Sequence, residues 1–168
     1  MFKNFDIDNF NQNPFELIAN EWMLITAKNK QNEKVNAMTA SWGGLGIMWG
    51  KPVAFVVIRP QRYTIDFVNS SNKFSLCFFD KKYKKTLSYF GTVSGRDEDK
   101  ISNSCLTVAE NSEIPYFNES KIVLLCSNLY KQKFEENCFI DKTIIKKWYP
   151  NKDYHYLYIA YVNQILTK

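Results

Sequence analysis

The chain has 168 residues, 45% of them hydrophobic and 23% charged, with a formal net charge of +5 at pH 7. This length and composition predict a single globular domain over residues 1–168 and argue against wholesale disorder or fibrous repeats. The apolar runs at 53–58 and 122–126 are too short to span a membrane and the first ten residues resemble no secretory signal, so we expect a cytoplasmic protein.

The first third of the chain predicts a short helix followed by a hairpin. Pro14 suits the first turn of a helix, and residues 22–28 form a β-like run. The polar residues 29–34 predict a turn, and residues 35–42 predict a second strand that pairs with the first. The glycine-rich residues 43–52 are expected to form a loop.

The middle of the chain predicts strands that alternate with helices. Residues 53–58 predict a strand buried on both faces, which Pro60 ends. A helix over 63–71, a strand over 73–79 and an amphipathic helix over 81–90 follow.

The last part of the chain is richer in strands. Residues 94–101 predict a polar turn that leads to a short helix, and residues 105–118 are irregular. Residues 121–131 and 154–165 predict long strands, with helix and loop between them. The sequence therefore favours a mainly β fold with peripheral helices, an antiparallel Greek-key barrel. A parallel doubly wound fold is the alternative, and it fits less well because helices do not alternate regularly with strands.

The four cysteines form no CxxC pair, so their spacing predicts no metal site and no redox pair. In a reducing compartment we expect them to be small buried side chains rather than disulfides. They are Cys77, Cys105, Cys126 and Cys138.

A glycine-rich segment, SWGGLGIMWGKP at 41–52, imitates two nucleotide-binding loops and matches neither. Leu45 and Pro52 break the P-loop pattern, and Trp49 breaks the dinucleotide pattern. What remains is a strand that ends in Thr39 and Ser41 and is followed by flexible backbone. Such a strand end suits backbone contacts with the edge of a flat heterocycle, although a loop that only turns a corner is the simpler interpretation.

The segment RPQRYT at 59–64 predicts a phosphate site. Arg59 and Arg62 supply forked donors, Thr64 supplies a hydroxyl, and a helix beginning near Tyr63 supplies unpaired N–H groups. These are two of only three arginines among 22 basic residues, which suggests that arginine is kept for planar, two-donor contacts. Structural salt bridges are the alternative, with Asp66 at helical spacing from Arg62.

A third segment, GTVSGRDEDK at 91–100, places further polar groups in a turn. They are Ser94, Gly95, Arg96 and Lys100. On spacing alone, a capped helix start explains this segment as well as a ligand contact does.

Together, NAMTASWGG, RPQRYT and SGRDEDK resemble, in this order and at these separations, the flavin reductase-like family of FMN-binding split-barrel proteins, which includes flavoredoxins. The resemblance runs from about Trp22 to Val162. It implies a split β-barrel homodimer with FMN in a cleft near the subunit interface. By position, it implies that the flavin ring is lined by Thr39, Ala40, Ser41 and Trp42. It implies that the phosphate is held by Arg59, Arg62, Tyr63 and Thr64, and that the site is closed by Ser94, Gly95, Arg96 and Lys100.

The resemblance also implies an FMN-dependent oxidoreductase that takes a hydride from NADH or NADPH and passes electrons to flavin, iron or a protein acceptor. The flavin carries this chemistry, so no catalytic acid or base is predicted. The single histidine, His155, either is structural or reaches the flavin site. Two alternatives remain. One is an electron carrier without NAD(P)H activity, and the other is a barrel that binds single-stranded nucleic acid, which only the aromatic content and the positive charge of the chain support. We expect neither nucleic acid nor membrane as a partner.

Overall fold

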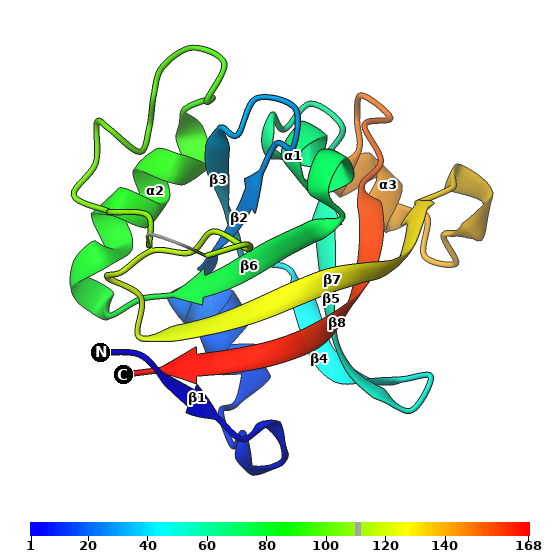
Figure 1. The fold of residues 1–168 in the computed structure, drawn as a ribbon. Helices are drawn as coiled ribbons and strands as arrows, with labels where there is room; N and C mark the ends of the chain where they lie inside the picture. Colours follow the sequence, from blue (N-terminus) through cyan, green and yellow to red (C-terminus); the bar gives the residue numbers. More distant parts are fainter. Residues whose placement is uncertain (110–111) are drawn as a thin grey trace.

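The computed structural model describes residues 1–109 and 112–168 (Figure 1). Within them, one eight-stranded sheet has the order β3-β2-β6-β7-β8-β5-β4, with β1 paired to β8. The strands are β1 (Lys3–Phe5), β2 (Met23–Lys28), β3 (Val35–Ala40), β4 (Gly43–Met48), β5 (Lys51–Ile58), β6 (Lys73–Phe78), β7 (Ile122–Lys133) and β8 (Tyr156–Thr167). The helices are η1 (Ile7–Asn9), the π-helix η2 (Glu16–Glu21), α1 (Thr64–Ser71), η3 (Lys81–Tyr83), α2 (Lys84–Thr92), η4 (Glu136–Cys138) and α3 (Thr143–Trp148).

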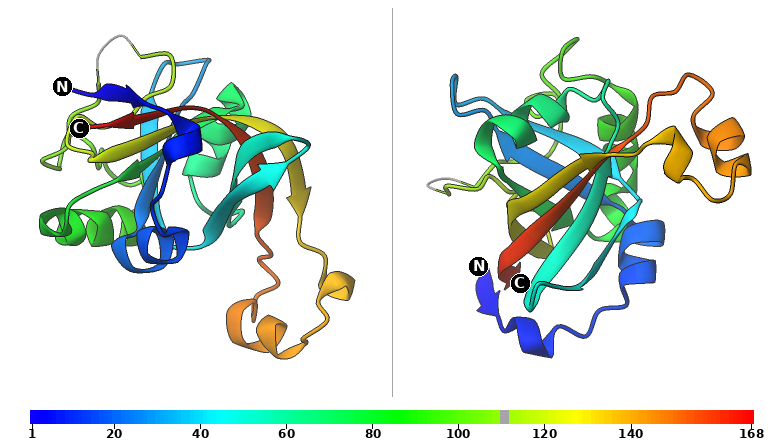
Figure 2. Two further views of the ribbon diagram at one scale, coloured as in Figure 1. Left: turned by 90° about the horizontal axis from the view of Figure 1, so that it is seen from below. Right: turned by 90° about the vertical axis from the view of Figure 1, so that its right-hand side faces the viewer.

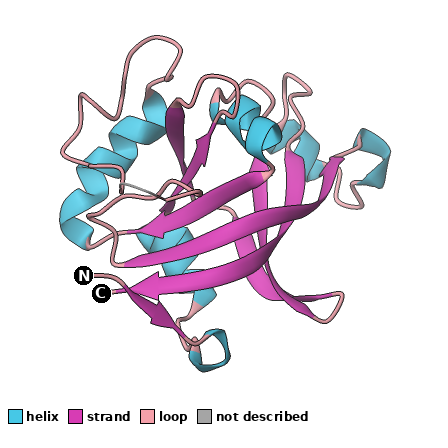
Figure 3. Ribbon diagram, viewed as in Figure 1, coloured by secondary structure: helices cyan, strands magenta, loops and turns pink. Residues whose placement is uncertain are grey.

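All strand pairs in the sheet are antiparallel, which confirms the mainly β fold and excludes the parallel doubly wound alternative (Figure 3). The edge strands, β3 and β4, follow one another in the chain, separated only by Ser41 and Trp42. The sheet therefore curls into a barrel that stays open between its two edges, which is a split barrel. The site described below lies at this corner.

Buried side chains form two clusters, one on each face of the first hairpin. Ile25 of β2 packs with Phe74 and Tyr158 inside the barrel, where α1 contributes Phe67. The neighbouring Leu24 points to the opposite face and joins the cluster beneath α2. Because successive residues of a strand face opposite sides, the continuous apolar run of β2 follows from burial on both faces.

The glycine-rich segment was expected to be a loop, and this prediction is wrong, because β4 occupies residues 43–48 and pairs with β5. Gly43 has φ +145°, and a Cβ there would lie 2.3 Å from the carbonyl oxygen of Phe55. Cβ atoms on Gly44 and Gly46 would meet the Phe55 ring, at 3.8 and 3.6 Å. Gly43 thus allows close approach to β5, whereas the distances at Gly44 and Gly46 are ordinary contacts. Strand pairing outweighs the low β propensity of these glycines.

Two further expectations are corrected. Residues 94–101 form turns without the expected short helix. Asp99 accepts the N–H groups of Ile101 and Ser102, which is the pattern of a helix cap, but the chain continues only as turns after it. Cys77 and Cys126 are buried as predicted, whereas Cys105 and Cys138 are exposed, since both lie in surface segments outside the sheet.

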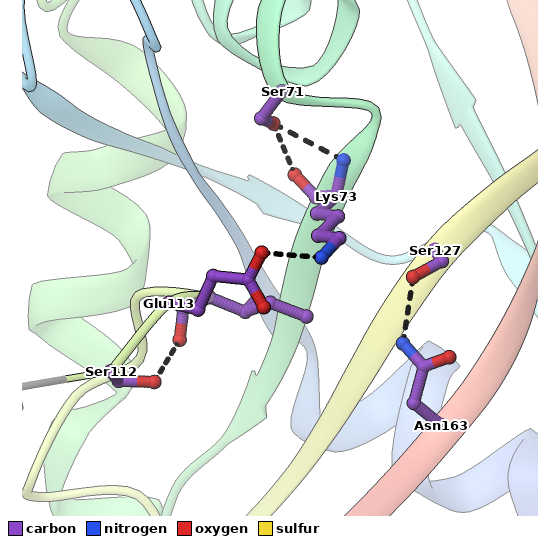
Figure 4. A network of polar contacts seen from close by, with 7 residues as sticks. Ser71, Lys73, Ser112, Glu113, Ser127 and Asn163 are labelled. Carbon is purple, nitrogen blue, oxygen red and sulfur yellow. Dashed lines mark hydrogen bonds and ion pairs between the residues drawn. The ribbon is translucent and has the colours of Figure 1, made fainter.

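Polar contacts tie the loop before β7 to the sheet. Lys73 at the start of β6 forms an ion pair with Glu113 (Figure 4). Ser75 donates to the carbonyl of Pro115 at 2.6 Å. Asn163 donates to Ser127 at 2.8 Å and links β8 to β7. No helix in the described part of the chain is both long and apolar enough to cross a membrane.

Residues 134–155, between β7 and β8, form what we call the arm. This segment contains η4 and α3 and projects from the body of the barrel (Figure 2, left). Helix and loop were predicted here. The base of the arm contacts the corner between β3 and β4, so the arm contributes one side of the site.

Candidate functional site

A cleft of about 610 Å³ opens where β3 turns into β4. The end of β3, the residues that follow β5, and the base of the arm line it. Seven of the predicted residues meet there, and these are Thr39, Ala40, Ser41, Trp42, Arg59, Arg62 and His155. Met38, Val57, Gln61 and Trp148 complete the lining and were not predicted.

The end of β3 and the residue after it contribute small side chains to the cleft, those of Thr39, Ala40 and Ser41. Thr39 donates its hydroxyl to the carbonyl of Leu87 in α2, so this side chain binds the helix behind the strand. A Cβ on Gly91 would lie 3.4 Å from the Cβ of Thr39, which shows how closely α2 approaches β3. The strand end therefore suits a flat ring that is recognised through backbone groups.

Three aromatic side chains form one side of the cleft, and we call them the aromatic wall, Trp42, Trp148 and His155. The rings of Trp42 and Trp148 meet edge to face at 4.9 Å, and Trp42 lies 5.3 Å from the His155 ring. The Tyr149 hydroxyl is 2.8 Å from Nδ1 of His155. Wall residues thus come from both the β3–β4 corner and the arm.

Burial and, to a smaller extent, the charge of Arg59 lower the pKa of His155 to about 4, while the charge of Asp153 opposes the shift. At neutral pH the imidazole is therefore uncharged. It is available to the cleft as a hydrogen-bonding group and not as a cation.

A smaller cavity of about 130 Å³ adjoins the cleft and shares Met38, Gln61 and Arg62 with it. It brings together most of the predicted phosphate and closure residues, which are Arg62, Tyr63, Thr64, Ser94, Gly95 and Lys100. Asn36, Thr92 and Val93 also line it.

Two cations face the small cavity. Arg62 donates to the carbonyl of Gly91 at 2.8 Å, and Lys100 donates to the carbonyls of Ala37 and Phe90 at 2.7 and 3.2 Å. Phe90 and Gly91 belong to the last turn of α2, whose carbonyl end favours positive charge. The fold therefore holds both cations through neutral carbonyl groups.

Neither Arg62 nor Lys100 has an acidic partner among the described residues. Lys100 is only 4% exposed, and burial together with the charge of Arg62 lowers its pKa to about 8. Burial and the charge of Arg59 likewise lower the pKa of Arg62. Unpaired buried charge destabilises a folded protein, so an anion in the cavity would offset this cost.

Thr64 begins α1 at the rim of the small cavity. Its hydroxyl accepts a hydrogen bond from the side-chain amide of Asn36 at 2.9 Å, and Tyr63 before it makes no side-chain cap. A Cβ on Gly95 would lie 2.3 Å from Oδ1 of Asn36, so a larger residue here would displace the amide that donates to Thr64. The start of α1 is thus fixed beside both cations.

Arg96 lies on the far side of Tyr63. Its guanidinium is 4.5 Å from the centre of the Tyr63 ring and forms an ion pair with Asp66 at 3.0 Å. Asp66 was considered as a structural partner for Arg62, and the structure pairs it with Arg96 instead. Arg96 lines a neighbouring cavity of about 540 Å³ rather than the small one.

Some of the lining residues that were not predicted could have been recognised from the local sequence. Asn36 is a buried polar residue in an apolar strand within NAMTASWGG, and Gln61 lies inside RPQRYT. Trp148 reaches the cleft only because the arm folds back, which no local pattern predicts.

Known proteins resemble this chain in sequence and in fold. The model of the Flavin reductase like domain matches residues 15–159. A curated relative, the uncharacterized protein YddH of Escherichia coli (strain K12), is 28% identical over 80 residues, and this match spans 48% of the chain and 42% of that protein.

Solved structures share the fold at low identity. An FMN-binding protein from Thermus thermophilus, with bound p-hydroxybenzaldehyde, is 17% identical with a TM-score of 0.68, covering 99% of this chain and 82% of that one. Flavoredoxin from Methanosarcina acetivorans is 19% identical with a TM-score of 0.68, covering 99% and 76%. The styrene monooxygenase flavin reductase of Pseudomonas putida S12 is 14% identical with a TM-score of 0.64, covering 88% and 79%.

Proposed function

The chain belongs to the family defined by the Flavin reductase like domain, and from this premise we propose that it is an FMN-binding oxidoreductase. One observation carries the proposal beyond the family. Arg62 and Lys100 lie unpaired, among the described residues, beside a small cavity that opens from a cleft suited to a flat ring. A ring joined to one terminal phosphate is the ligand this arrangement favours.

The residues present fit FMN. Arg62, Lys100 and the start of α1 at Thr64 would hold the phosphate, and the backbone of residues 39–42 would line the ring. Bound FMN supplies hydride and single-electron chemistry, for which the protein provides orientation and electrostatics. Neutral His155 is placed to offer a hydrogen bond without adding charge to the cleft.

We propose that NADH or NADPH reduces the bound flavin, which then passes electrons to flavin, iron or a protein acceptor. The likeness to a flavoredoxin supports a second candidate, an electron carrier without NAD(P)H activity. Anaerobic absorbance spectroscopy of the FMN-loaded protein separates the two. Rapid bleaching by NAD(P)H supports the reductase, whereas bleaching by dithionite alone supports the carrier.

We expect the protein to bind FMN at least tenfold more tightly than FAD, an estimate that corresponds to about 1.4 kcal/mol. The small cavity, about 130 Å³, suits one terminal phosphate, and an added adenylate does not fit within this volume. Fluorescence titrations of the flavin-free protein with each ligand measure the difference, and equal affinities would contradict it.

We also propose that the protein is a homodimer. The outer side of β5 and β8 carries Val53, Phe55, Val57, Leu157, Ile159 and Tyr161. Val53 and Ile159 are already buried in the single chain, and the other four are half-buried. None of these residues belongs to either core cluster, although their alternating neighbours in β5 and β8 do. This outer sheet face reaches the cleft through Val57, so a second copy that covers it would also border the flavin site.

Light scattering tests the homodimer. We expect twice the subunit mass of 19.8 kDa for the wild-type protein, and a monomer for Phe55→Arg, because a charge in an apolar interface cannot be paired there. Ile140→Arg is the matched control, since Ile140 is fully exposed on the arm and outside this face. A wild-type monomer with FMN bound would contradict the proposal.

A further inference from the structure

Among the described residues, the side chain of Arg59 makes its hydrogen bonds with two residues of the arm, Trp148 and Asp153. Its Nη1 forms an ion pair with Asp153, and its Nη2 donates to the carbonyl of Trp148 at 2.8 Å. The guanidinium also lies 5.3 Å from the centre of the Tyr149 ring. Gln61 donates to the same carboxylate oxygen of Asp153 at 2.7 Å. Arg59 and Gln61, which follow β5, thus bind the arm at the Asp153 carboxylate and at the Trp148 carbonyl.

Each of these contacts leads to the aromatic wall. Trp148 is itself a wall residue, Tyr149 bonds His155, and Asp153 lies two residues before His155. The ion pair is partly shielded from water, with side chains that are 25% and 17% exposed. Because Arg59 binds both Asp153 and the Trp148 carbonyl, it restricts the arm more than a single exposed ion pair does.

We propose that Arg59 is a positioning residue that holds Trp148 and His155 of the arm against Trp42, and so shapes the ring-binding cleft, instead of binding the phosphate. The sequence alone assigns Arg59 and Arg62 to the same phosphate. In the structure they differ, since Arg62 lines both cavities whereas Arg59 lines only the cleft. The identity of the ring rests on the proposed function, but the positioning of the wall does not.

The single histidine makes the proposal testable in the flavin-free protein, because a wild-type NMR titration follows one imidazole. In Asp153→Asn, loss of charge alone would lower the pKa of His155 further, since Asp153 raises it. Loosening of the wall would instead expose the imidazole and raise the pKa from about 4 toward 6.5. A rise supports the proposal, and a fall or no change overturns it.

Arg59→Lys separates geometry from charge in the same titration. Lysine keeps the positive charge but cannot reproduce the fork that contacts Asp153 and the Trp148 carbonyl together. We expect the pKa of His155 to rise, and an unchanged pKa would contradict the proposal. Lys73→Ala is the control, because the ion pair between Lys73 and Glu113 that it breaks does not involve the aromatic wall, so the pKa of His155 should stay unchanged.

Flavin titrations provide an independent readout. Riboflavin and FMN share the ring, so Arg59→Lys should weaken both by the same factor, roughly threefold to tenfold as for the loss of an aromatic contact. A loss confined to FMN would show that Arg59 binds phosphate and would overturn the proposal. If the wild-type protein binds neither flavin, the proposed function fails, and the His155 titrations still decide whether Arg59 positions the wall.

Discussion

Replacing Arg62 with alanine is expected to lower the affinity for FMN roughly tenfold to a hundredfold and to leave riboflavin binding almost unchanged. The guanidinium lines the small cavity and has no acidic partner among the described residues. A charge-assisted contact with a phosphate contributes about 1.5–3 kcal/mol, which corresponds to this range. Riboflavin lacks the phosphate, so it does not gain from the contact.

Three measurements complete this test, namely titrations with each flavin and the melting temperature of the flavin-free variant. Arg62 donates to the carbonyl of Gly91, so its loss carries some structural cost. Arg96→Ala is a useful comparison, because Arg96 forms an ion pair with Asp66 outside the small cavity. Equal losses for FMN and riboflavin in Arg62→Ala would remove the phosphate assignment.

The elements that the sequence predicted well are those with a strong local pattern. The apolar runs of β5, β7 and β8 and the helical spacing in α1 and α2 are visible over a few residues, and the structure confirms these elements. The strand β4 was missed because its glycines have a low β propensity, and the close approach of Gly43 to the Phe55 carbonyl becomes visible only once β4 pairs with β5. The three-residue strand β1 is too short to carry a pattern.

The candidate site was likewise predicted only where a local motif indicates it. Residue types within motifs indicated which groups approach a ring and a phosphate, but only the fold decides which of two arginines faces which cavity. Arg59 and Arg62 are equivalent by spacing, yet Asp153, 94 residues away from Arg59, pairs with the first of them. The contribution of Trp148 likewise depends on a fold-back of the arm. Long-range pairing of this kind leaves no signal in a single sequence.

Lys100 gives the small cavity a pH dependence with opposite signs for folding and for binding. Because its pKa in the flavin-free protein is lowered to about 8, the folded chain releases a proton that the unfolded chain keeps as pH rises above that value. The Lys100 contribution to the free energy of unfolding therefore increases from about pH 8 up to the ordinary lysine pKa. FMN binding should change in the other direction, because the phosphate needs the charged ammonium.

Between pH 7 and pH 9 we accordingly expect FMN affinity to fall by up to about tenfold relative to riboflavin, since a group with a pKa near 8 is about one-tenth protonated at pH 9. Ionisation of the ring is common to both ligands, so the ratio of their affinities isolates the phosphate. In Lys100→Met this ratio should already be lower at pH 7 and should no longer change with pH. Titrations of both flavins at several pH values, with chemical denaturation of the flavin-free proteins alongside, measure both trends. A wild-type ratio that stays constant from pH 7 to 9 would mean that Lys100 does not contact the phosphate.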